Sequence, residues 1–111
     1  MAIKEKIIDG VAVLQVKGKL LGGSETDDLH SKLRQLQRQD IHRIVLDLAT
    51  LKRINSSGLA ALMVAKATLR NAGGDLKLVN VEGEVLNVFM ITKLTTIFES
   101  YKSLDRAIKS F

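Results

Sequence analysis

Residues 43–70 read RIVLDLATLKRINSSGLAALMVAKATLR and carry the clearest structural signal of the chain. The first six are nearly all apolar, which predicts a central strand that is covered on both faces. From Leu59 the apolar residues continue through about two helical turns, so we expect a helix over residues 59–70 with Met63 in the core. This helix should be the most buried one, and the glycines after Ala72 end it. A buried strand followed by a buried helix is typical of α/β domains.

The residues before this segment predict a hairpin and a surface helix. Two β-prone runs, residues 3–8 and 11–16, flank Asp9-Gly10, a pair that suits a tight turn with positive φ at both positions. We expect Gly18 to end the second strand. Ser24 resembles a helix cap with acidic residues behind it, and the apolar residues that follow recur at helical spacing: Leu29, Leu33 and Leu36.

The residues after this segment continue the alternation of strands and helices. We expect a strand over residues 76–81, a short helix around residues 85–89 with Phe89 in the core, and a brief strand over residues 96–98. We expect Ser103 to cap a last helix. The apolar side chains that should pack this helix against the domain are Leu104, Ile108 and Phe111. The order β-β-α-β-α-β-α-β-α predicts one α/β domain over residues 1–111, with a mixed sheet flanked by about four helices.

The composition excludes several classes of function. The chain has 111 residues and no cysteine, so disulfides, thiolate metal sites and cysteine nucleophiles are absent. The first residues do not resemble a signal peptide, and no apolar run approaches the roughly 20 residues of a membrane span. We therefore expect a cytoplasmic protein. The net charge of +5 is spread along the chain, with Lys52-Arg53 as the only adjacent basic pair, and we expect no nucleic-acid binding.

A pair of hydroxyl groups precedes the buried helix in the segment Ile54-Asn55-Ser56-Ser57-Gly58-Leu59. Loops at the carboxyl ends of parallel strands are where α/β folds place function. Serine or asparagine can cap the helix here, and a phosphate on either serine would face unpaired N–H groups and the positive end of the helix dipole.

This arrangement resembles a known family. The apolar strand, the short loop and the segment from Ile54 to Leu59 are similar to the D-S-[ST]-G-L signature of bacterial anti-sigma-factor antagonists, which are STAS domains. Further agreement extends along the chain in order: Gly73-Gly74-Asp75-Leu76, Val88-Phe89, Ile91-Thr92-Lys93-Leu94 and Ser103-Leu104-Asp105-Arg106-Ala107. Two positions depart from the family: Asn55 replaces its aspartate, and Leu20-Leu21-Gly22-Gly23 lacks an acidic residue that many members have.

The resemblance implies a switch that is controlled by phosphorylation. In that family the serine after the aspartate, here Ser56, is phosphorylated by an anti-sigma factor that is a serine kinase. The unphosphorylated protein binds the kinase and frees the sigma factor, and a phosphatase resets the switch. Ser57 is the second candidate for the modified residue. The residues expected at the partner surface are Leu51, Lys52, Arg53, Ile54, Asn55, Ser56, Ser57, Gly58, Leu59, Gly22, Gly23 and Ser24.

Two other functions remain open. The chain could be a constitutive STAS subunit of a larger complex, such as a lipid-transport ATPase, without phosphorylation. A small serine hydrolase would need a base beside the serine, but His30 and His42 stand alone and no G-x-S-x-G elbow is present. Asp47 has no second carboxylate nearby, so we expect it to anchor a loop. We expect no catalytic residue, metal or cofactor, and a monomer or weak dimer.

Overall fold

The computed structural model describes residues 3–111, and the fold is built on a mixed five-stranded sheet with the order β1-β2-β4-β6-β7. The first two strands are antiparallel, and the others follow in parallel with β2. The predicted α/β class and mixed sheet are therefore confirmed. The strands are β1 (Ile3–Ile8), β2 (Val11–Val16), β4 (Arg43–Asp47), β6 (Asp75–Val79) and β7 (Ser100–Tyr101).

The hairpin between β1 and β2 has the predicted turn. Asp9 and Gly10 have φ angles of 52° and 78°, the positive values that a two-residue primed turn requires. This turn fixes the register, in which Ile3 faces Val16 and Ile8 faces Val11.

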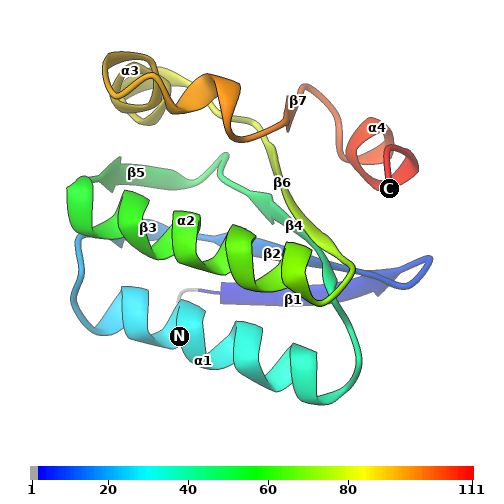
Figure 1. The fold of residues 1–111 in the computed structure, drawn as a ribbon. Helices are drawn as coiled ribbons and strands as arrows, with labels where there is room; N and C mark the ends of the chain where they lie inside the picture. Colours follow the sequence, from blue (N-terminus) through cyan, green and yellow to red (C-terminus); the bar gives the residue numbers. More distant parts are fainter. Residues whose placement is uncertain (1–2) are drawn as a thin grey trace.

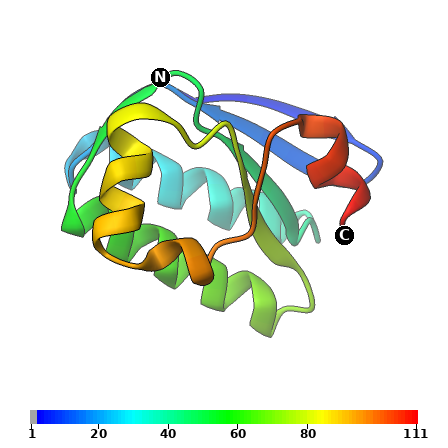
Figure 2. The same ribbon diagram turned by 90° about the horizontal axis from the view of Figure 1, so that it is seen from above.

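Two hydrophobic cores lie on opposite faces of the sheet, because side chains alternate along each strand. The larger core joins Leu14, Ile44 and Leu78 to the helices α1 (Ser24–Arg38), α2 (Ser56–Asn71) and α3 (Gly83–Ile91). The smaller one joins Val13 and Val45 to Ala107 of α4 (Leu104–Lys109). Figure 1 shows α1 and α2 side by side on one face, and Figure 2 shows α4 against the sheet on the other side.

A second, two-stranded sheet extends the fold beyond the predicted elements. The strands β3 (Gly18–Leu20) and β5 (Leu51–Ile54) pair in parallel. The second strand ends at Val16, just before Gly18 as expected, but this glycine also begins β3, and its N–H donates to the carbonyl of Thr50 at 3.2 Å. The expectation of a short loop between the apolar strand and Ile54 is wrong for residues 51–54, which form a strand whose partner lies more than thirty residues earlier in the chain.

The starts and burial of the two long helices differ in part from the predictions. Ser24 is the first helical residue rather than the cap, and Gly23 holds the capping position without a side-chain bond. The predicted apolar stripe of α1 is confirmed, since Leu29, Leu33 and Leu36 are buried. In α2, Met63 is 42% exposed and lies outside the core, because only one side of this helix is covered by the sheet and its neighbours.

The C-terminal third contains one misplaced strand. The brief strand predicted over residues 96–98 is a 3-10 turn, η1 (Leu94–Thr96), followed by Phe98, which packs edge-to-face on the buried Phe89 with ring centroids 5.7 Å apart. The edge strand is β7 instead. The cap of α4 is confirmed, because the hydroxyl of Ser103 accepts the N–H of Arg106 at 3.2 Å.

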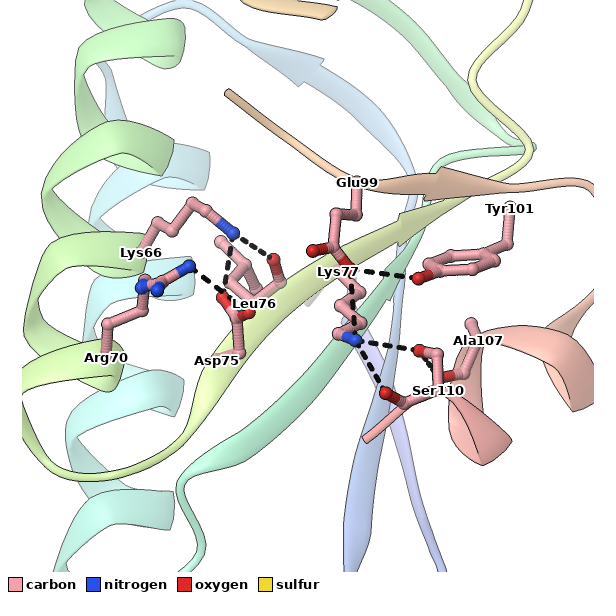
Figure 3. A network of polar contacts seen from close by, with 9 residues as sticks. All are labelled: Lys66, Arg70, Asp75, Leu76, Lys77, Glu99, Tyr101, Ala107 and Ser110. Atoms are coloured by element: carbon pink, nitrogen blue, oxygen red, sulfur yellow. Dashed lines mark hydrogen bonds and ion pairs between the residues drawn. The ribbon is translucent and has the colours of Figure 1, made fainter. Parts of the chain in front are cut away.

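Two buried lysines hold β6 in place, Lys66 of α2 and Lys77 of β6 itself (Figure 3). Lys66 of α2 donates from Nζ to Asp75 Oδ1 at 2.7 Å and to the carbonyl of Leu76 at 3.2 Å. Burial raises the pKa of Asp75, but the hydrogen bonds from Lys66 and the Leu76 N–H, with the charges of Lys66 and Arg70, outweigh it and hold that pKa below its usual value. The pair therefore ties α2 to the start of β6.

Lys77 connects β6 to the C-terminal residues (Figure 3). Its Nζ donates to the carbonyl and the Oγ of Ser110 at 3.0 and 2.8 Å, and it forms an ion pair with Glu99 at 3.1 Å. The hydrogen bond from Lys77, aided by that of the Tyr101 hydroxyl, lowers the pKa of the Glu99 carboxyl. With three acceptors, this buried ammonium is fully satisfied.

Candidate functional site

The candidate site lies where β5 passes into α2, at Asn55. This residue is extended, with φ −122° and ψ −174°, and it is the N-cap of α2. Its Oδ1 accepts the N–H of Gly58 at 3.0 Å, which satisfies one of the unpaired donors at the helix start. Its own N–H donates to the carbonyl of Leu20 at 3.3 Å, continuing the pairing of β5 with β3. The helix therefore begins at Ser56, three residues before the predicted start.

The side-chain amide of Asn55 makes a hydrogen bond that an aspartate could not make. Its Nδ2 donates to the carbonyl of Leu21 at 3.3 Å, so one side chain caps α2 and also holds the loop that follows β3. A carboxylate at this position would keep the cap and add a favourable charge at the helix start, but it has no hydrogen to give to Leu21. Compared with aspartate, the asparagine therefore lacks the charge, but it links the start of α2 to the loop after β3.

Both serines are exposed on the first turn of α2. Neither hydroxyl has a hydrogen-bond partner among residues 3–111, and the first turn contains no acidic residue. The Cβ of Ser57 lies close to the loop after β3, since a Cβ placed on Gly22 would come within 2.8 Å of it. Gly22 also has φ +90°, which favours glycine. The loop after β3 therefore restricts access to Ser57 from one side, whereas it does not restrict access to Ser56.

Gly58 sets the height at which α2 sits over β3. A Cβ at this position would lie 2.1 Å from the carbonyl oxygen of Leu20 and 2.9 Å from Cγ1 of Ile54. Only glycine permits this approach. The glycine in the S-S-G-L segment therefore holds the helix start, the end of β5 and the loop after β3 together as one surface.

The predicted partner residues divide into an exposed and a buried group. The side chains of Leu51, Ile54 and Leu59 are buried, at 5%, 6% and 4% exposure, so they support the surface from within instead of forming it. Gly58 is buried as well. The exposed members are Lys52, Arg53, Asn55, Ser56, Ser57, Gly22, Gly23 and Ser24. We call this exposed group the docking surface.

A hollow of about 260 Å³ adjoins the docking surface at Asn55. Leu21 and Ile54 line it from one side, and Glu84 and Val88 of α3 line it from the other. Arg53 closes one wall by pairing with Glu84, with 3.8 Å between Nε and Oε2. Sequence reasoning missed the two α3 residues. Their i, i+4 spacing indicates one helix face, but nothing in the sequence says that this face meets β5.

The histidines and carboxylates of the described residues do not gather around the two serines. His42 lies before β4, with Nε2 3.0 Å from Asp40 Oδ1, and no hydrogen bond within residues 3–111 joins Ser56 or Ser57 to a base. The same residues hold no group of three or more histidines or carboxylates that could bind a metal ion. No helix among them is both long and apolar enough to cross a bilayer.

Asp47 anchors a loop, as predicted. Its Oδ1 accepts the N–H of Ala49 and the Nδ2 of Asn80, both at 3.0 Å. These two bonds fix the turn between β4 and β5, and through it the strand that leads to Asn55.

Comparison with known proteins gives one consistent result. The STAS domain family matches residues 2–107. A protein of Bordetella bronchiseptica named as a proposed anti-sigma factor antagonist, BtrV, is 29% identical over 104 residues, which cover 94% of this chain and 89% of that protein.

Two solved structures share the fold. A protein of Thermotoga maritima, also proposed to be an anti-sigma factor antagonist, has a TM-score of 0.84 and 24% identity over 97% of this chain and 92% of its own. The Bacillus cell fate determinant SpoIIAA in its phosphorylated form has a TM-score of 0.74 and 18% identity over 98% of both chains.

Proposed function

The chain belongs to the STAS domain family, and we propose that it is an anti-sigma-factor antagonist, a regulatory protein of the cytoplasm without catalytic activity of its own. In this proposal the docking surface binds an anti-sigma factor with serine kinase activity, and binding releases a sigma factor. Phosphorylation of Ser56 ends the interaction and a phosphatase restores it. The observation that carries the proposal is the exposed Ser56 hydroxyl at an uncovered helix start, directly beside a hollow.

The helix start suits a phosphate physically. The N–H groups of Ser56 and Ser57 have no acceptor within residues 3–111, because Asn55 caps Gly58 instead. A phosphate brings about −1.5 to −2 charges, which the helix dipole and these N–H groups favour. The modification should therefore leave the fold intact and change only what the surface can bind.

The same charge would oppose a partner that packs closely there. The unphosphorylated surface carries the exposed Lys52 and Arg53, of which Arg53 pairs with Glu84, and it has no acid in the first turn of α2. Acidic groups of a partner fit this surface, and an apolar side chain fits the hollow beside Asn55. A dianionic phosphate on Ser56 would repel those acidic groups and would have to be desolvated, which is how it would end binding.

The names of the relatives support this proposal. BtrV and the Thermotoga protein are each named as a proposed anti-sigma factor antagonist, and SpoIIAA has been solved in both phosphorylated and unphosphorylated forms. We extend both properties to this chain because the folds are similar and because the segment around Ser56 resembles the family signature.

The test is to map the phosphate. The chain is incubated with its cognate kinase and ATP, and intact-mass and fragment-ion spectrometry locate the modification in the parent, Ser56→Ala and Ser57→Ala proteins. We expect one phosphate, on Ser56, which is lost only in Ser56→Ala. A phosphate on Ser57 alone would refute the assignment. No phosphate with a kinase that binds tightly would favour a constitutive subunit of a larger complex, such as a lipid-transport ATPase.

The Asn55→Asp variant tests the departure from the family pattern. It restores the family carboxylate and loses the hydrogen bond to Leu21. We expect faster phosphorylation of Ser56 than in the parent, which would show that the asparagine attenuates the switch. An unchanged rate would mean that the kinase does not use the charge at this position.

A further inference from the structure

Part of the sheet face that carries α4 is uncovered and forms a groove. The helix packs on β4, β6 and β7, whereas β1 lies beyond it (Figure 2). The groove has a volume of about 280 Å³, close to the lower limit of about 300 Å³ for small-molecule sites. Its apolar part is Val13 and Leu104, and its polar side chains come from three neighbouring strands: Lys4, Lys6, Gln15 and Asp47.

The register of the sheet places these polar groups on one face and in a fixed order. Lys4 is paired with Gln15, and Gln15 is paired with Asp47, so the three form a row across β1, β2 and β4. Lys6 is paired with Val13 in the next row. With about 4.8 Å between strands, the Cα atoms at the two ends of the row are about 10 Å apart. One end of the groove is therefore basic and the other end acidic.

These charges are not neutralised within the described chain. Over residues 3–111 no acidic group lies within ion-pair distance of Lys4 or Lys6, and no basic group lies that close to Asp47. Glu5, which also borders the groove, points to the other face and pairs with Lys32 at 2.9 Å.

The carboxylate of Asp47 is also held rigidly. Its Oδ1 accepts from Ala49 and Asn80, and its Oδ2 accepts nothing within residues 3–111. A fixed carboxylate with an unused oxygen is prepared to receive a cation at little further cost in entropy. The two lysines, which are long and exposed, supply adaptable donors at the opposite end.

We infer that this groove binds an aliphatic amino acid in its zwitterionic form. The ammonium group of the ligand donates to Oδ2 of Asp47, and its carboxylate accepts from Lys4 and Lys6. Its hydrocarbon side chain lies over Val13 and Leu104. A purely anionic ligand would face the unpaired carboxylate, and a purely cationic one would face the two ammonium groups. Only a ligand with both charges satisfies both ends, and this inference is independent of the role proposed for Ser56.

The experiment is a titration of the full chain with L-leucine, followed by ¹H–¹⁵N NMR. We expect saturable shifts at the amides of Val13 and Gln15 with a dissociation constant of about 1 mM or lower. Leucinamide lacks the carboxylate and 4-methylpentanoate lacks the ammonium group, so both should bind at least about tenfold more weakly than L-leucine. No saturable shift with L-leucine, or equal binding of the three compounds, would overturn the inference.

Three variants locate the site. Asp47→Asn keeps an oxygen that can accept from Ala49 and Asn80, so the fold should persist while L-leucine binding weakens about tenfold or more. A double change of Lys4 and Lys6 to glutamine should have a similar effect. Lys93→Gln removes an exposed lysine outside the groove and should bind like the parent. Folded Asp47→Asn protein that binds L-leucine as tightly as the parent would place the ligand elsewhere.

Discussion

Replacing Gly58 by alanine should pull apart the surface around Ser56 and lower the stability of the domain. The added Cβ would meet the Leu20 carbonyl oxygen at 2.1 Å and Ile54 Cγ1 at 2.9 Å. The oxygen is backbone and also accepts the N–H of Asn55, so it cannot move away without breaking the pairing of β3 with β5. Overpacking of this kind costs about 1–3 kcal/mol, and backbone contact places Gly58→Ala near the upper limit.

Alanine is a better helix former than glycine by about 1 kcal/mol, which offsets part of this cost. We therefore expect a net loss of about 2 kcal/mol in the free energy of unfolding, measured by urea denaturation. Gly23→Ala is the control for space, since no atom lies within 4 Å of a Cβ at that position, and it should cost only about 0.5–1 kcal/mol, because alanine is a poorer N-cap than glycine. Equal stability of Gly58→Ala and the parent would refute the close approach of α2 to β3.

Three further predictions follow from the polar contacts. Asn55→Ala removes the cap of α2 and should cost about 1 kcal/mol in urea denaturation, with faster amide exchange in the first turn of the helix; an unchanged first turn would contradict the capping role. Asp75→Asn leaves the buried ammonium of Lys66 without its counter-charge and should cost about 3 kcal/mol, more than Lys66→Met, after which Asp75 keeps its hydrogen bond from Leu76. Because the folded state lowers the pKa of Asp75 below 3.8, the stability from this pair is complete above about pH 5 and is lost as the pH falls through the lowered pKa. Urea denaturation at a series of pH values should therefore show a shallower acid loss in Asp75→Asn than in the parent, and parallel curves would refute the assignment.

The elements that could be predicted from sequence are those whose signal is local. The Asp9-Gly10 turn, the apolar strand β4, the leucine stripe of α1 and the Ser103 cap all depend on residues within a few positions of each other. Each was found because turn conformation, side-chain alternation and capping are properties of short segments.

The misses depend on contacts between distant segments. β5 is only four residues long with two basic residues inside it, and it is a strand because β3 pairs with it. Met63 is as apolar as its neighbours, but no element covers it. Lys66 is polar yet buried, because Asp75 and the carbonyl of Leu76 satisfy its charge from β6.

The candidate site also contains residues that could be predicted from local sequence and residues that could not. The segment Asn55-Ser56-Ser57-Gly58 could be found from sequence, because cap, hydroxyls and glycine adjoin. The burial of the neighbouring leucines and the contribution of Glu84 and Val88 to the hollow required the fold, since α3 reaches the end of β5 only through the packing of the whole domain.

The most direct test of the proposed function is the affinity of the docking surface for the cognate anti-sigma kinase, measured by calorimetry. Ser56→Asp should bind about tenfold more weakly or worse, which corresponds to at least about 1.4 kcal/mol, and Ser56→Ala should bind like the parent. Ala67→Asp is the charge-matched control, on an exposed residue of α2 about 16 Å along the helix, and it should also bind like the parent. If Ser56→Asp binds the kinase as tightly as the parent, the start of α2 is not the partner surface.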